Sequence, residues 1–400
     1  MKSSYNCKAW NKISIAVVLF SCLHATAQLP RPVSHSLEST VYDTVRNITV
    51  VLPKDYYTRP ERRFEVLYVL DAQDERLFDL AASIVNYATG DNFIPVILVG
   101  IRTTSRWDEF LPAPEHQETV DLVSEYFGEG FKFGHADNLA AHLKSELFPF
   151  VEKLYRTLPT RLAIGHSLGG TFLTYCNVRY PELFNGTVCI SPNLVFDNSS
   201  LLDKVARFKN SEPALQAYNF IAYGSADSYE RQFLPGITSA IKLFESPDRN
   251  STLFGHKQFT DANHATVLSY GIQAGLSDFY NKVFLTGNNV IAYYDAMMTS
   301  CSINVTPDDV DALAQKCLSH EKSYDALTII KWGLRIFPDN SDLYLCLGEV
   351  QESLGNSADA AECYRSAAKV LQSQKTLYNE SVYARKLIQY NSKLRKLRLK

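Results

Sequence analysis

The stretch RLAIGHSLGG, residues 161–170, places a glycine two positions before and two positions after Ser167. RLAI predicts a strand, and the apolar residues after Ser167 recur on one helical face until Pro181. A strand, a Gly-His-Ser-Leu-Gly turn and a helix form the arrangement of a nucleophile elbow. Only glycine fits so tight a turn without a clash at Gly165 and Gly169. We therefore interpret Ser167 as a displayed nucleophile rather than an idle serine in a glycine-rich helix start.

Strands and helices alternate around this motif. RFEVLYVLDAQ (63–73) and FIPVILVGI (93–101) are nearly continuous apolar runs, typical of strands buried on both faces. ERLFDLAASIVNYA, between them, has helical spacing, and later strands are expected in YNFIAYG (218–224) and STLFGHKQF (251–259). This alternation predicts an α/β fold with a parallel, doubly wound sheet.

A serine hydroxyl is a weak nucleophile, so the interpretation requires a base and a carboxylate that orients it. In this kind of fold the chain order is serine, acid, histidine. His256 lies within a predicted strand and His320 in a helical region, whereas His264 lies in the polar loop DANHATV before a helix. We expect His264 to be the base.

The acid should follow the preceding strand, in IAYGSADSYE. Asp227, three residues after Gly224, is the first candidate and Glu230 is the alternative. Asp227 could instead cap the helix that SYERQF begins. For the oxyanion hole, position alone points to the backbone N–H of Leu168 and to that of Gln73 or Ala72.

The first 27 residues have the features of a secretory signal peptide. Three lysines precede a short apolar run (13–23), and ATA (25–27) fits a small-residue cleavage site. Lipoprotein cleavage before Cys22 is the alternative, which the bulky Phe20 disfavours. No later apolar stretch is long enough for an anchor, so we expect an exported protein, periplasmic or secreted.

Composition excludes some classes of function. The hydrophobic fraction of 46% and the charged fraction of 21% are those of a folded protein. The net charge of −3 becomes −6 once the three leader lysines are removed, which disfavours nucleic-acid binding. The basic end KLRKLRLK (393–400) is interpreted as a solvated helix face. Six cysteines outside the leader lack metal-site spacing and are expected to be free thiols with no zinc: Cys176, Cys189, Cys301, Cys317, Cys346 and Cys363.

The pattern changes near residue 300, after which only helical periods occur. YDAL (324–327) and ADAA (358–361) are offset by 34 residues, the tetratricopeptide period. We expect a signal peptide over 1–27, an α/β domain over 28–290 and a tetratricopeptide-like helical domain over 296–400. Two repeats are few for an independent array, so the helices are expected to pack on the α/β domain. The alternative is that they form a groove that binds a protein or peptide partner.

Six motifs between Val41 and Tyr280 resemble the esterase family of the α/β-hydrolase superfamily, which includes siderophore esterases, feruloyl esterases, S-formylglutathione hydrolases and mycolyltransferases. They are VLYVLDAQ, VILVGIRTTSRWDEFLP, LFPFVEKLY, LAIGHSLGGTF, YPELFNGTVCISPNL and NHATVLSYGIQAGL. The resemblance implies an α/β-hydrolase fold and ester chemistry, with no metal or organic cofactor. It implies a triad of Ser167, Asp227 and His264, and an oxyanion hole at Leu168 and Gln73.

Arg106 and Asp108 match the family's Arg-x-Asp segment near the pocket. Arg106 and His166 are the candidates for substrate contact, with a structural ion pair as the alternative role for Arg106. The family usually has Asp-Gly after the early strand, where this sequence has Asp71 followed by alanine, so we expect this loop to have a different conformation.

We therefore expect an exported serine hydrolase that cleaves carboxylic esters through an acyl-enzyme. A siderophore, a cell-wall ester linked to an oligosaccharide or a small xenobiotic ester would fit. Two alternatives stay open. One is an acyltransferase of the same fold, and the other is an inactive hydrolase that binds a partner through its helical repeats.

Overall fold

The computed structural model describes residues 31–397, except 59, 61, 89–94, 208–216, 247–251 and 302–304. Within these residues the centre is an eight-stranded sheet, in the order β1-β2-β4-β3-β5-β6-β7-β8. The strands are β1 (Val33–Ser39), β2 (Thr44–Val51), β3 (Phe64–Val69), β4 (Val96–Ile101), β5 (Thr157–His166), β6 (Gly186–Ile190), β7 (Ala217–Gly224) and β8 (Thr252–Phe259).

Most of the sheet is parallel, as predicted. Strands β3 to β8 run parallel, whereas β1 and β2 form an antiparallel hairpin and β2 pairs antiparallel with β4. Strand β4 lies on one side of β3 and β5 lies on the other, so the strand order reverses there. The carboxyl ends of β3 and β5 are therefore the switch point, where α/β sheets bind ligands.

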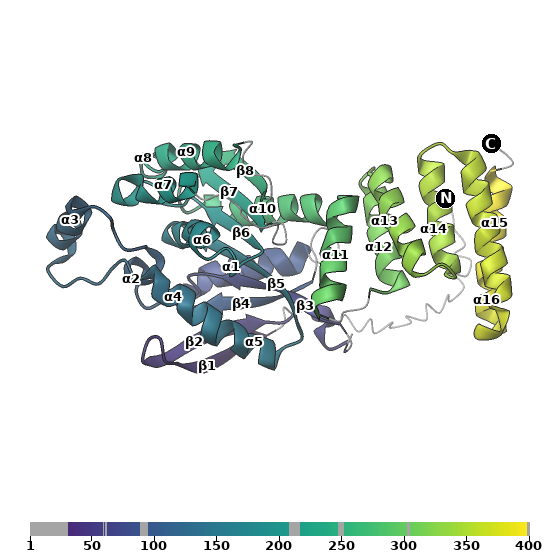
Figure 1. The fold of residues 1–400 in the computed structure, drawn as a ribbon, viewed down its shortest axis with the longest axis horizontal. Coiled ribbons are helices and arrows are strands. Elements are labelled where there is room, and N and C mark those ends of the chain that lie inside the picture. The colour runs from purple at the N-terminus through teal and green to yellow at the C-terminus, as the bar shows by residue number, and fades with distance from the viewer. Residues whose placement is uncertain are drawn as a thin grey trace, which may run out of the picture.

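Helices cover both faces of the sheet (Figure 1). On β3, Leu67 and Val69 pack into the core on one face, and Val66 and Tyr68 pack into the core on the other. One face is covered by α1 (Glu75–Ala88), α10 (Val267–Val283) and α11 (Gly287–Cys301). The other is covered by α4 (Ala136–His142), α5 (Phe148–Leu154), α6 (Leu168–Arg179), α7 (Ser200–Arg207) and α9 (Leu234–Phe244).

Shorter helices lie in the connecting segments. A π-helical turn, η2 (Leu143–Leu147), joins α4 to α5, so the three segments form one continuous helix that is widened in its middle. The remaining short helices are α2 (Arg106–Phe110), α3 (Gln117–Phe127), α8 (Ser228–Arg231), η1 (Lys54–Tyr56), η3 (Phe196–Ser199) and η4 (Lys375–Leu377). Helices α2 and α8 carry side chains to the carboxyl edge of the sheet.

The chain after the sheet is all helical, as predicted. It forms α12 (Pro307–Ser319), α13 (Ser323–Ile336), α14 (Ser341–Ser353), α15 (Ser357–Ser373) and α16 (Glu380–Leu397). Helices α12 and α14 begin 34 residues apart, and so do α13 and α15. Small residues let the paired helices approach. A Cβ at Gly348 would lie 2.2 Å from the Tyr364 ring, and a Cβ at Gly333 would lie 2.3 Å from Val310.

Helix α11 joins the helical segment to the sheet (Figure 1). The Tyr293 hydroxyl on α11 donates to the buried carboxylate of Glu65 on β3. On the other side of α11, Trp332 Nε1 donates to Asp295 Oδ1 at 3.1 Å. One apolar core runs from the sheet through α10 and α11 to α14. The helical segment therefore packs on the α/β domain, and α11 spans the boundary that we expected between residues 290 and 296.

The sequence also makes predictions about the leader, the cysteines and a metal site. The predicted signal peptide, 1–27, lies outside the described residues, and none of the described helices has the length and hydropathy of a membrane span. Cys176, Cys189, Cys317 and Cys346 are buried free thiols, and Cys363 is a partly buried one. No group of three metal-ligating side chains occurs among the described residues.

Candidate active site

Ser167 stands on a strained turn between β5 and α6, as the motif predicts. Its φ of 58° and ψ of −121° lie in a region that side chains rarely adopt and that is typical of functional sites. A Cβ at Gly165 would lie 2.5 Å from the backbone of Gly169, which explains why glycine is required there. The turn is held by two backbone bonds, Ser167 N to Ile190 O at 2.8 Å and Thr171 N to Ser167 O at 3.0 Å.

His264 lies in the loop between β8 and α10, and its Nδ1 is 2.6 Å from Glu230 Oε2. Glu230 is fully buried, and its Oε1 accepts from Gly224 N at 2.8 Å and from the Ser191 hydroxyl. Burial opposes the charge, but the hydrogen bonds from His264, Ser191 and Gly224 lower the pKa of Glu230 below its usual value. An ionised Glu230 requires the His264 tautomer with a proton on Nδ1, which leaves Nε2 free as a base.

The position of Asp227 requires a correction. Its side chain caps α8 by accepting from the backbone N–H of Glu230 at 2.7 Å. A carboxylate that turns back onto its own helix does not face the loop that carries His264. The structure thus places Glu230, the alternative, at the position where we expected Asp227, and it gives Asp227 the capping role.

His166, the residue before Ser167, lies directly against His264. The two ring centroids are 4.5 Å apart, and His166 Nε2 is 2.8 Å from the backbone oxygen of His264. Burial, together with the nearby charge of His264, lowers the pKa of His166 to about 4. His166 is therefore neutral near pH 7, and its Nε2–H is engaged by the histidine loop. These contacts favour a positioning role over the substrate contact that we expected.

Two backbone groups remain available as oxyanion donors. Leu168 is the first residue of α6, and N–H groups in a first helical turn have no partner within the helix. Ala72 N donates to Ile101 O at 3.0 Å, which removes Ala72 as a candidate and leaves Gln73. The Gln73 side chain fixes this turn, because Nε2 donates to Asp71 Oδ1 at 2.8 Å and Oε1 accepts from Thr103 N at 3.0 Å.

Arg106 connects this turn to the elbow. Its guanidinium donates to both Asp71 oxygens, at 2.8 and 3.0 Å, and to His166 O at 3.1 Å. Asp71 has a φ of 64°, in the left-handed region, and the ion pair holds it there, whereas Ala72, at the position of the family's glycine, does not have a positive φ. Arg106 therefore has the structural ion pair of the alternative reading, although 38% of its side chain is exposed. Asp108 takes no part, and lies 2.5 Å from His135 instead.

Sequence reasoning missed three contributors to the site. Ser191 follows β6 and donates to Glu230, while Tyr229 and Phe233 place their rings against His264. Ser191 carries one signal, because it lies in CISPNL directly after an apolar strand, where a parallel sheet brings polar residues to the site. No sequence signal identifies Tyr229 and Phe233, because contacts between rings that are distant in the sequence depend on how the fold packs.

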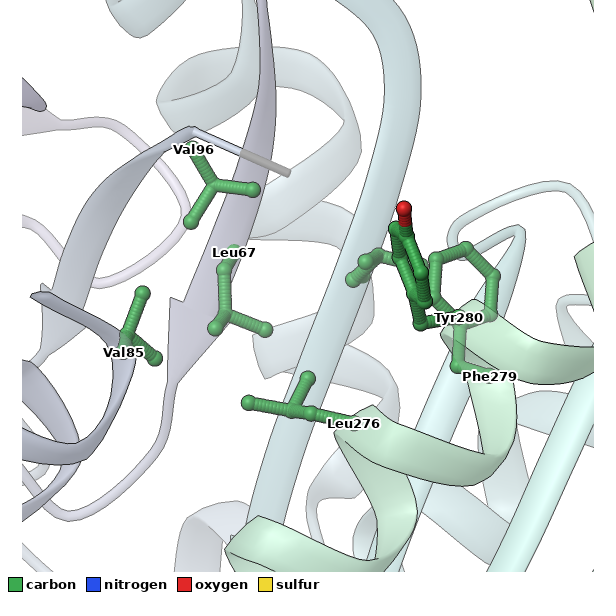
Figure 2. Close-up of a pocket in the computed structure, with 7 residues that line it drawn as sticks. Leu67, Val85, Val96, Leu276, Phe279 and Tyr280 are labelled. Atoms are coloured by element: carbon green, nitrogen blue, oxygen red, sulfur yellow. The ribbon is translucent and has the colours of Figure 1, made fainter. Parts of the chain in front are cut away.

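Two hollows lie elsewhere on the sheet. An apolar cavity of about 20 Å³ lies between the sheet, α1 and α10, and Figure 2 shows the side chains that line it. Its lining residues are Leu67, Val85, Val96, Leu162, Leu276, Phe279 and Tyr280. A polar groove of about 520 Å³ runs between β8 and α10. Ser167 and His264 line neither, and the small cavity is about the size of one water molecule.

Comparisons with known proteins find a matching family model and two relatives of low sequence identity. Residues 39–228 match the family model described as "Putative esterase", a range that includes Ser167 and ends before Glu230. "Uncharacterized protein YbbA" of Bacillus subtilis is 25% identical over 191 residues, which is 47% of this chain and 71% of that protein. "Putative methylesterase 12, chloroplastic" of Arabidopsis thaliana is 26% identical over 146 residues, 34% of this chain and 39% of that protein.

Solved structures share the fold. An IroE-like serine hydrolase from Shewanella oneidensis has a TM-score of 0.57 at 22% identity, covering 77% of this chain and 99% of that one. A protein from Capnocytophaga ochracea has a TM-score of 0.56 at 13% identity and covers 90% of this chain and all of its own, so the likeness extends into the helical segment. Residues 39–228 thus match the model of an esterase family, and the chain shares the fold of the IroE-like serine hydrolase.

Proposed function

We propose that this protein is an exported serine hydrolase that cleaves carboxylic esters through an acyl-enzyme, with Ser167, His264 and Glu230 as its triad. One observation carries the proposal. A histidine paired with a buried, ionised carboxylate packs against His166, the residue directly before a serine held on a nucleophile elbow. Export rests on the sequence of residues 1–27 alone.

In the proposed acylation step, Ser167 Oγ attacks the ester carbonyl while His264 Nε2 takes its proton. Glu230 stabilises the imidazolium and holds the ring in the required tautomer. Among the described residues no hydrogen bond joins Ser167 Oγ to His264, a contact that tightens with substrate in many hydrolases. The alcohol then leaves with the proton from His264.

The developing oxyanion is stabilised by the backbone N–H groups of Leu168 and Gln73. Both donors lie in turns of fixed conformation. Leu168 follows Ser167, whose backbone is held by the elbow, and the side chain of Gln73 is held by Asp71 and Thr103. Donors that are already oriented need no reorganisation during the reaction, which makes this type of stabilisation strong. Water activated by His264 then hydrolyses the acyl-enzyme and releases the acid.

Hydrolysis of p-nitrophenyl butyrate by the chain without its predicted leader tests the proposal. We expect turnover by the parent protein and a loss of at least about 10³-fold in Ser167→Ala, with labelling of Ser167 alone by a fluorophosphonate. Equal rates in the two proteins, or no labelling of the parent, would overturn the proposal. Adding an alcohol acceptor and analysing the products separates hydrolysis from acyl transfer.

A further inference from the structure

The side chains around His264 differ in how far they are buried. Its Nδ1 faces Glu230, and its ring lies 4.5 Å from the His166 ring and 5.3 Å from the Phe233 ring, measured between centroids. Phe233 is 4% exposed and Glu230 is fully buried. The fourth neighbour is Tyr229, whose ring centre lies 5.0 Å from that of His264, edge to face at 86°. Tyr229 is 55% exposed, whereas the side chain of His264 is 17% exposed.

Tyr229 is also held in place. Its ring meets Phe233 edge to face at 5.4 Å and 89°, and α8, which carries it, is capped by Asp227. The next residue, Glu230, is fixed by three hydrogen-bond donors. An exposed aromatic ring that is already oriented loses little conformational freedom when a ligand packs against it.

The chemistry of the proposed reaction determines which half of the ester lies beside Tyr229. The oxygen of the leaving alcohol takes its proton from His264, so that oxygen must lie within hydrogen-bond reach of the imidazole. The carbonyl is held instead at Ser167, by donors from Leu168 and Gln73. The substituent on the alcohol oxygen therefore lies nearest to the groups around His264, of which Tyr229 is the exposed one.

We propose that Tyr229 forms the wall of a subsite for the alcohol half of the ester, and that this subsite favours alcohols that carry an aromatic ring. This inference rests on the proposed function. The ring of such an alcohol packs against Tyr229, whereas a ring on the acyl half does not reach it. Tyr229 thus selects the leaving group without taking part in proton transfer.

Two isomeric esters provide the test. Benzyl acetate carries its ring on the alcohol half, and methyl phenylacetate carries the same ring on the acyl half. We expect Tyr229→Ala to lower kcat/KM for benzyl acetate about fivefold more than for methyl phenylacetate, which is the scale of one aromatic contact. Tyr229→Phe, which keeps the ring, should retain the parent's ratio of the two kcat/KM values. Tyr324→Ala, which removes a 78% exposed tyrosine from α13, is the matched control and should change neither.

The alternatives give distinct results. Equal losses on the two isomers would mean that Tyr229 only supports His264, and a larger loss on methyl phenylacetate would place the acyl half there. Either result overturns the inference. A second measurement, inhibition of p-nitrophenyl butyrate hydrolysis by benzyl alcohol, should weaken about fivefold in Tyr229→Ala, and unchanged inhibition counts against it. Loss of all ester turnover and of labelling at Ser167 in the parent protein would refute the proposed function itself.

Discussion

Glu230 Oε2 lies 2.6 Å from His264 Nδ1 at the carboxyl edge of the sheet. The same carboxylate is tied to the ends of β6 and β7 through Ser191 and Gly224 N. The histidine loop is thereby anchored to the centre of the sheet, although His264 itself follows the edge strand β8. This contact fixes both the tautomer and the direction of the imidazole.

The first prediction separates the two candidate acids. Glu230→Gln cannot stabilise an imidazolium and turns an amide toward Nδ1, so kcat/KM for p-nitrophenyl butyrate should fall about 10³-fold or more. Asp227→Asn is the matched control, because asparagine also caps helices well, and its rate should stay within about threefold of the parent. The reverse ranking of these two variants would restore Asp227 as the acid.

The second prediction concerns His166 and pH. Its pKa is about 4 in the folded protein and about 6.5 in the unfolded chain, so between these values the unfolded chain binds more protons. The free energy of unfolding should therefore fall as the pH is lowered from about 6.5 to about 4. The contribution of His166 is at most roughly 3 kcal/mol. His166→Gln does not titrate, so its urea-unfolding free energy should fall less over this range than that of the parent.

Kinetics of the same site distinguish positioning from simple packing. The Nε2 amide of glutamine can donate to His264 O in place of the imidazole, so His166→Gln should keep most of kcat. His166→Ala loses this bond at 2.8 Å and should lower kcat by about tenfold, with little change in KM. Equal activity of the alanine and glutamine variants at equal stability would argue against a positioning role.

The elbow, the parallel sheet and His264 could be predicted because each depends on local sequence. Gly165 is required by a backbone clash within one turn, and ERLFDLAASIVNYA forms α1 over Glu75–Ala88 as its apolar spacing predicts. The clash expected at Gly169 is wrong, because a Cβ there would lie 3.4 Å from Asp71 Oδ2, an ordinary contact. The identity of the acid could not be settled in this way. Asp227 and Glu230 both follow β7 and lie about one helical turn apart. Which of them pairs with His264 depends on which one caps α8, and the sequence does not show this.

Long-range contacts explain the other gaps. Arg106 pairs with Asp71, 35 residues earlier in the chain, rather than with Asp108 two residues later. Strand β1 has few buried residues, so it lacks the alternation that identifies a strand. The boundary expected between residues 290 and 296 falls inside α11, because that helix contacts both the sheet and α13, which no local pattern reveals.

The third prediction tests the paired helices. Gly348→Ala would place a Cβ 2.2 Å from the ring of Tyr364, which is fully buried. An alanine normally stabilises an exposed helix by up to about 1 kcal/mol relative to glycine, so a net loss of about 1–3 kcal/mol in urea unfolding would identify the clash. Adding Tyr364→Leu should recover part of the loss, since the shorter side chain makes room. Stability equal to or above that of the parent would mean that the helices can separate freely.

The last prediction concerns the junction between the sheet and the helical segment. Tyr293→Phe removes the hydroxyl that donates to Glu65, whose side chain is 6% exposed. An unpaired buried acceptor costs about 1–3 kcal/mol, and the loss of the donor raises further the pKa of a carboxyl that burial already holds above its usual value.

An acid whose pKa is raised by folding binds more protons in the folded state, so stability falls as the pH rises above the unfolded value of about 4.5. The difference in unfolding free energy between the parent and Tyr293→Phe should therefore grow between pH 4.5 and pH 7. Tyr294→Phe, at the next position, is the control, because the Tyr294 ring still meets Trp332 without its hydroxyl. A constant difference across this pH range would show that Glu65 does not titrate in response to Tyr293, and the junction would then depend on apolar packing alone.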